Sequence, residues 1–179
     1  MAESASSSGL VRGNGVSALL DAGILADHAV LVDSFWTMAI KWRWSYNSPL
    51  GDNEDGVIRA RGTLLTSNKR LKNGFYKIKS IKGKRDGDLI TGLVDAGTPI
   101  PGNTIYAGDN LIRSNRKGRP QLTGNGFQYA LDNGTYSNVF YADFLAPPSY
   151  LEFHSVPPFP EGPTLPNTEL GVVFRAVIL

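Results

Sequence analysis

Residues 36–46 read Trp-Thr-Met-Ala-Ile-Lys-Trp-Arg-Trp-Ser-Tyr, and this stretch decides the fold. Large apolar side chains occupy every second position, with small or charged side chains between them. Successive side chains of a β-strand point to opposite faces, so this period of two predicts a strand with one buried face.

The sequence on either side of this stretch predicts further strands separated by turns. The loop Gly83–Gly87 and the pair Asn133-Gly134 have the composition of hairpin turns. The predicted strands cover residues 36–46, 57–66, 75–82, 88–94, 105–112, 127–132, 136–144, 150–154 and 170–179. Eight or nine strands with no long helix favour an all-β fold, an antiparallel β-sandwich, with a small β-barrel as the alternative.

The ends of the chain differ from this pattern. Residues 1–15 form a polar Ser/Gly segment that we expect to be an N-terminal arm, flexible by itself or ordered by a neighbouring subunit. Residues 16–26 have a weak helical period and could form a short helix. We therefore expect one β domain over residues 16–179, with a proline-rich arm at residues 156–168.

Composition excludes several kinds of chemistry. The chain has no cysteine, which removes disulfides, thiol catalysis and cysteine-bound zinc. The acidic stretch 52–56 fails the calcium-loop pattern at both ends, because glycines stand where the first Asp and the last Glu are needed. We expect no metal and no cofactor. The apolar region 16–40 carries three aspartates and does not predict a membrane span, and no secretory signal is seen at the N-terminus.

Positive charge is concentrated in the middle of the chain. Residues 57–119 hold 14 basic and 4 acidic side chains, whereas both flanking regions are acidic. Such a run predicts a surface for anions or for an acidic protein patch, or else a solvated sheet face. No module that reads DNA sequence is present. The candidate binding residues are Lys69, Arg70, Lys72, Lys77, Lys79, Lys82, Arg113, Arg116, Lys117 and Arg119.

Two other groups of side chains are candidate sites. The aromatic face of residues 36–46 is mostly core, and Trp44 and Tyr46 are the candidates to reach a rim where a sugar could stack. Tyr150, Glu152 and His154 share one face of a predicted strand and could hold an acid/base pair. No serine elbow, second carboxylate motif or phosphate loop accompanies them, so no catalytic residue is predicted.

The segment from residue 90 to 153 resembles the β-rich domain of cyanobacterial exported proteins that end in a PEP-CTERM sorting signal. The resemblance covers approximately residues 55–176 and includes Phe75-Tyr76-Lys77-Ile78, Gly97-Thr98-Pro99-Ile100-Pro101-Gly102-Asn103 and Pro147-Pro148-Ser149-Tyr150-Leu151-Glu152-Phe153. It implies no catalytic residues. The chain lacks the export signal and the sorting tail, so we expect a related module reused in another assembly, such as a virus of a cyanobacterium.

These observations predict a non-enzymatic structural protein. The leading expectation is a decoration, or cement, subunit of a cyanophage virion or another surface coat, located on the virion or the extracellular surface. Its partners would be further copies of the chain or a shell protein, reached by the terminal and proline-rich arms. A secreted glycan-binding module and a small β-barrel enzyme with an apolar pocket are the alternatives.

Overall fold

The structure is a computed structural model that describes residues 39–49, 57–116 and 118–179. Nine strands and no helix are found in this part of the chain, which confirms the all-β prediction. The strands are β1 (Ile40–Asn47), β2 (Arg59–Thr66), β3 (Tyr76–Arg85), β4 (Asp88–Leu93), β5 (Leu111–Ile112), β6 (Phe127–Leu131), β7 (Tyr136–Ala142), β8 (Ser149–Ser155) and β9 (Thr168–Ile178).

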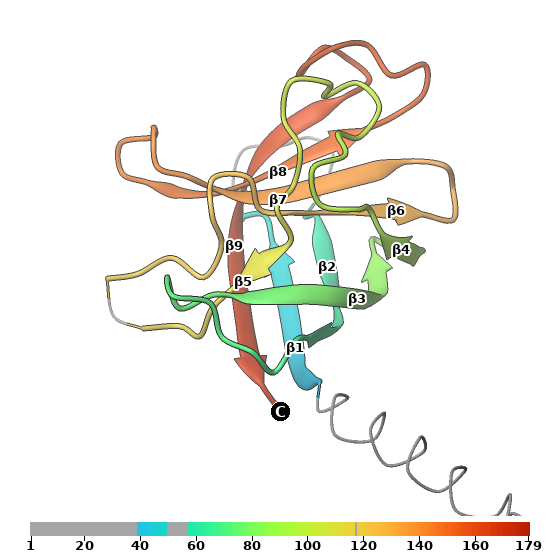
Figure 1. The fold of residues 1–179 in the computed structure, drawn as a ribbon. Coiled ribbons are helices and arrows are strands. Elements are labelled where there is room, and N and C mark those ends of the chain that lie inside the picture. The colour runs from blue at the N-terminus through green and yellow to red at the C-terminus, as the bar shows by residue number, and fades with distance from the viewer. Residues whose placement is uncertain (1–38, 50–56, 117) are drawn as a thin grey trace, which may run out of the picture. The chain divides into compact units, whose positions relative to one another are not determined.

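Eight of these strands close into an antiparallel barrel (Figure 1). The order is β2-β1-β9-β8-β7-β6-β4-β3, and β3 pairs with β2 to complete the circle, while β5 adds to β3 from outside. The prediction of a sandwich is therefore wrong, and the barrel alternative is correct. Strand count and spacing are the same in both folds, whereas the β9–β1 pairing needed for closure joins the first and last described strands, which are distant in sequence.

Both predicted hairpin turns are present. Asp86 and Gly87 join β3 to β4 with positive φ angles of 49° and 105°, the geometry that a two-residue hairpin turn needs. Gly134, with a φ of 83°, lies in the turn between β6 and β7. Local turn chemistry thus set the register of these two strand pairs.

Aromatic side chains fill the interior of the barrel. Trp42, Trp44 and Tyr46 of β1 point inward and are at most 2% exposed. The ring of Trp44 meets Phe127 of β6 edge to face at a centroid distance of 5.7 Å, and Phe127 packs against Phe174 of β9. The prediction that Trp44 and Tyr46 reach a rim is wrong, because a closed barrel buries a whole inward strand face.

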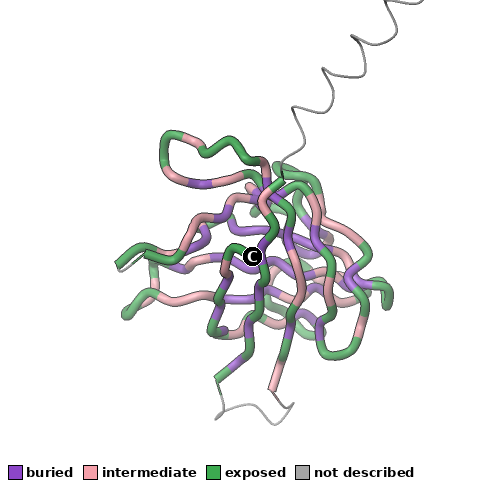
Figure 2. The backbone as a smooth tube through the Cα atoms, turned by 90° about the horizontal axis from the view of Figure 1, so that it is seen from below, coloured by how far each residue is buried: buried purple, intermediate pink, exposed green. Residues whose placement is uncertain are grey.

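The outside of the barrel is covered on one side only. On β7 and β8 the outward residues Phe140, Leu151 and Phe153 are buried too, since they pack with Ile100 from the loop after β4 in a second hydrophobic cluster. On β1 the outward residues, which occupy every second position of the strand, are instead all exposed. Figure 2 shows this alternation of buried and exposed backbone along the strands. No described helix is long and apolar enough to cross a membrane.

Strand closure depends on a close approach of two glycines. Gly62 of β2 pairs with Gly83 of β3, and a Cβ atom on Gly62 would lie 1.9 Å from the carbonyl oxygen of Lys82. We expect Gly62→Ala to lower the free energy of unfolding by about 1–3 kcal/mol, because the backbones must move apart. Urea unfolding measures the change. The control is Gly171→Ala in β9, where a Cβ meets nothing within 4 Å and stability should not fall. Equal effects of the two substitutions would contradict the close packing.

Candidate functional site

A pocket of about 540 Å³ opens on the covered side of the barrel. Its floor is the outward face of β7 and β8, and its walls come from the loop at residues 94–110 and the proline-rich segment 156–167. Residues 124 and 125 and residues 143 and 144 close the other end. The pocket therefore lies outside the barrel, between the sheet and two long connections.

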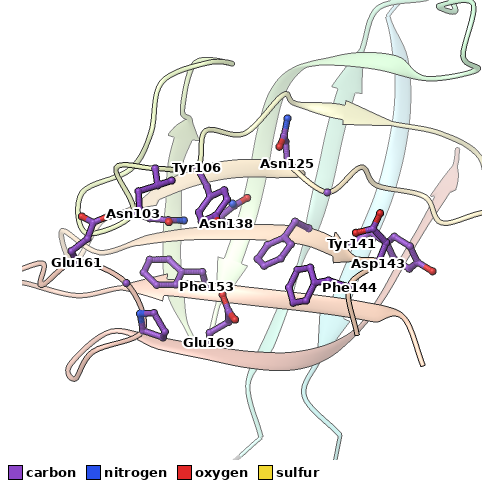
Figure 3. A pocket seen from close by; sticks show the side chains of 15 residues that line it. Asn103, Tyr106, Asn125, Asn138, Tyr141, Asp143, Phe144, Phe153, Glu161 and Glu169 are labelled. Carbon is purple, nitrogen blue, oxygen red and sulfur yellow. The ribbon is translucent and has the colours of Figure 1, made fainter. Parts of the chain in front are cut away.

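The lining combines aromatic surface with hydrogen-bond acceptors (Figure 3). Among the lining residues there is no lysine, arginine or histidine, so the described wall is acidic. The aromatic members are Tyr106, Phe140, Tyr141, Phe144 and Phe153; the acidic members are Asp143, Glu161 and Glu169; the amides are Asn103, Asn125 and Asn138. Tyr106 and Phe144 are 62% and 71% exposed, which leaves their rings free at the mouth.

The proline-rich segment is held against its own barrel. The buried side chain of Asn167 accepts a hydrogen bond from the amide of Val156 at 2.8 Å and donates to the carbonyl of Gly162 at 3.1 Å. Glu161 accepts from the amide of Thr104 at 2.9 Å, which ties this segment to the opposite wall. The expected arm toward neighbouring subunits is thus a wall of the pocket.

Two buried amide oxygens lack donors beside this pocket. Asn138 is 2% exposed, and its Oδ1 has no hydrogen-bond partner among the described residues. Gln128, its register partner on β6, donates from Nε2 to the carbonyl of Tyr106 but leaves Oε1 equally unpaired. A buried acceptor without a donor costs about 1–3 kcal/mol. Both oxygens are enclosed by protein atoms, so this cost is internal to the wall and offers no acceptor to a ligand in the pocket.

Glu169 completes a row of outward side chains across the sheet. Gln128, Asn138, Phe153 and Glu169 are successive register partners on β6, β7, β8 and β9. Partial burial raises the pKa of the Glu169 carboxyl. The row thus places two amide groups, one aromatic ring and one partly desolvated carboxyl side by side on the covered face.

A second polar cluster lies inside the barrel. Arg85 binds Glu152 with both ends of its guanidinium group, Nε to Oε1 at 2.7 Å and Nη2 to Oε2 at 3.1 Å. The Tyr46 hydroxyl donates to the same carboxylate and shares a hydrogen bond with the Tyr129 hydroxyl. Arg85 is 7% exposed although the sequence places it in the basic run. We call Arg85, Glu152, Tyr46 and Tyr129, together with Ser137 and His154, the interior network.

Charges in the interior network are fixed by its geometry. Burial opposes ionisation of Glu152, but the Arg85 guanidinium and its hydrogen bonds hold the pKa of that carboxyl below its ordinary value. Burial lowers the pKa of His154 to about 4, and the Arg85 charge acts in the same direction. Burial also raises the pKa of both tyrosines. At neutral pH the network holds one ion pair and neutral partners.

The predicted shared face of Tyr150, Glu152 and His154 points into the barrel. His154 Nδ1 lies 3.0 Å from Ser137 Oγ, and Tyr150 packs against Phe174. Neither Glu152 nor His154 lines the pocket. Glu152 is buried and His154 is half-buried inside the barrel, and both are hydrogen-bonded there. Neither residue can serve as an acid or a base for a ligand in the pocket.

The predicted basic residues separate into two groups. Arg70, Arg113, Arg116 and Arg119 surround a hollow of about 10 Å³, which is too small for more than a water-sized group. Arg113 is committed in part to packing, since its guanidinium lies 4.5 Å from the centre of the Phe75 ring. Lys69 and Lys72 are exposed on the adjoining loop, and Lys77, Lys79 and Lys82 are exposed on β3.

Some predictions fall outside the described residues. These are Lys117, the acidic stretch 52–56, the arm at residues 1–15 and the short helix at residues 16–26. In the part of the chain that the structure describes, no group of three metal-ligating side chains occurs.

Comparison with protein-family models, curated proteins and solved structures yields no match to this chain. The resemblance to the exported cyanobacterial domain stays a prediction.

Sequence reasoning missed the pocket because its lining comes from six separate segments. Single residues such as Asn138 or Phe144 carry no signal in a sequence that is rich in both types. One local sign exists: Phe140 and Ala142 alternate with Val139 and Tyr141, so both faces of the last part of β7 are apolar and need a cover.

Proposed function

We propose that this protein is a non-enzymatic binding module for a neutral or amino-bearing glycan, which the pocket on the covered side of the barrel accommodates. The observation that carries this proposal is the lining itself. Aromatic rings at the mouth and the exposed carboxylates of Asp143 and Glu161 stand together in a concave site of ligand size.

Sugars match both halves of this lining. A pyranose ring has an apolar face that packs on an aromatic ring and a rim of hydroxyl groups that donate hydrogen bonds. Phe144 and Tyr106 offer the first contact, and the carboxylates of Asp143 and Glu161 offer acceptors for the second. This supports the glycan-binding alternative from the sequence, with a site different from Trp44 and Tyr46.

The charge of the pocket selects among sugars. Asp143, Glu161 and Glu169 repel a carboxylate or sulfate, and no described lining residue carries a positive charge. Neutral oligosaccharides and amino sugars therefore fit the site, whereas uronic and sialic acids do not.

Calorimetric titration with neutral, amino and acidic oligosaccharides tests this proposal. We expect binding from the first two classes, and a loss of about tenfold in affinity in Phe144→Ala, because the stacking ring is removed.

Leu89→Ala is the matched control, because Leu89 is an exposed apolar residue on β4 outside the pocket. It should bind as the unaltered protein does. Absence of binding across the panel, or equal losses in the two variants, would contradict the proposal.

The decoration-subunit hypothesis stays a prediction. Its N-terminal arm lies outside the described residues, and its proline-rich arm is hydrogen-bonded to the barrel through Asn167 and Glu161. The pocket therefore favours ligand binding as the function of this domain.

A further inference from the structure

The uncovered side of the barrel carries a grid of positive charge. On β9, β1, β2 and β3, cross-strand partners place Arg175, Ser45, Arg61 and Lys84 in one outward row. The next row holds Val177, Arg43, Thr63 and Lys82. Arg61 and Lys84 are directly opposed, with Cβ atoms about 4.5–5.5 Å apart, and Arg43 lies diagonal to Arg61 and to Arg175 at about 7–8 Å. We define the basic face as Lys41, Arg43, Arg59, Arg61, Lys82, Lys84 and Arg175.

All members of the basic face are exposed. Among the described outward positions of the four strands between Val173 and Val177, Lys41 and Asn47, Arg59 and Leu65, and Ser80 and Lys84, none is acidic. Asp86, at the end of β3, accepts from the amide of Arg59 and pairs with Arg85. No ion pair between described residues involves a member of the basic face.

A bulge on β3 extends this face. Leu65 pairs with Ser80, but Thr66 pairs with Ile78, so Lys79 is the extra residue. The shift lets odd-numbered Lys77 and even-numbered Lys82 both point outward. Lys77 and Lys82, two of the candidate binding residues predicted from the sequence, therefore lie on the same outward side of β3.

The composition of the face selects the kind of anion. Four of its seven members are arginines, whose planar guanidinium groups bind sulfate, carboxylate or phosphate through paired hydrogen bonds. Ser45 and Thr63 lie between the charges and add hydroxyl groups. A repeating anion can thus meet charged and neutral donors in turn.

Several polyanions fit the face poorly. Single-stranded nucleic acids gain affinity from stacking on aromatic rings, and the aromatic residues of these four strands, Trp42, Trp44, Tyr46, Tyr76 and Phe174, pack on the core side. The outer face of a closed barrel is convex, so a rigid duplex or a flat bilayer would meet only part of it. A thin, flexible chain of anionic groups can follow the curvature.

We propose that the basic face binds a linear sulfated polysaccharide. The site is separate from the acidic pocket, which lies on the outward side of β7 and β8. Binding there and binding in the pocket are independent, since none of the pocket's lining residues belongs to the basic face.

Titration with a heparin decasaccharide tests this proposal. The unaltered protein should bind it with an affinity that falls as NaCl increases. The variant Arg43→Ala/Arg61→Ala/Lys82→Ala/Lys84→Ala should lose at least about tenfold in affinity. Binding of a neutral or amino sugar to the pocket should be unchanged in this variant, which separates the two proposals.

The charge-matched control is Lys69→Ala/Lys72→Ala/Arg116→Ala/Arg119→Ala, which removes the same net charge from the loops. It should keep affinity within about threefold, because only long-range attraction is lost. Equal losses in both variants would show attraction to net charge alone and overturn the proposal. Equal or tighter binding of oligothymidine, duplex DNA, polyglutamate or phosphatidylserine vesicles would also overturn it.

Discussion

Replacing Arg85 by methionine should lower the free energy of unfolding by about 3–5 kcal/mol, because Glu152 would be left as a buried charge without its counter-ion. The carboxylate is 1% exposed and receives both guanidinium contacts inside the barrel. The Tyr46 hydroxyl that remains can donate one hydrogen bond but carries no charge. Urea unfolding of the two proteins at pH 7 measures the difference.

Removing the acid at the same time should restore most of this stability. In Arg85→Met/Glu152→Leu no buried charge remains, and apolar replacement of a buried ion pair is often neutral or stabilising. A double-mutant cycle with Glu152→Leu completes the test. A loss below about 1 kcal/mol in Arg85→Met alone would contradict the interior network as described.

Acidification from pH 6.5 to pH 4 should destabilise the protein through His154. Burial lowers the pKa of this imidazole to about 4 in the folded state, against an ordinary value of 6.5. The unfolded chain therefore binds more protons over that interval, and stability falls as the pH falls. The contribution is on the order of 3 kcal/mol, since each pKa unit corresponds to about 1.4 kcal/mol.

The effect of His154 and the effects of the carboxyl groups fall in different pH ranges. Because the pKa of Glu152 is lowered, its contribution is present above the ordinary carboxyl pKa and is lost only at more acidic pH. Burial raises the pKa of Asp109 and Glu169, which acts in the opposite direction near that same range. His154→Gln should therefore flatten the plot of unfolding free energy against pH between pH 5 and 6.5. A slope unchanged by His154→Gln would contradict this origin.

Much of the strand content could be predicted from sequence because it depends on local patterns. Alternation fixed the inward face of β1, and the residues at 86–87 and 133–134 set two hairpins. Closure could not be predicted, because it depends on the pairing of β1 with β9, for example of Trp44 with Ala176, which are far apart in sequence. These contacts join strands that local propensity does not relate.

The sites show the same division. The face shared by Glu152 and His154 was predicted correctly, but its partner Arg85 comes from another strand, in the basic stretch 57–119, and local sequence does not relate the two. Basic residues on β1, β2 and β9 were not singled out, because Arg43, Arg61 and Arg175 are scattered in sequence and meet only through sheet register. The strand register brings these arginines, which are far apart in sequence, onto one surface of the barrel.

The two outer sides of the barrel thus have opposite character. The covered side holds an acidic, aromatic pocket at β7 and β8, and the uncovered side presents the basic face. This division would allow a small sugar and an anionic polymer to bind at once, since neither site shares residues with the other.

Amide chemical-shift mapping with the tightest neutral or amino oligosaccharide from the calorimetric panel tests the central claim most directly. The pocket predicts that shifts concentrate at Gly124, Asn125, Asn138, Phe144 and Gly162, and that the basic face and the interior of β1 remain unperturbed. Shifts centred on β9, β1, β2 and β3, or no shifts at saturating sugar, would contradict the assignment of the pocket as the binding site.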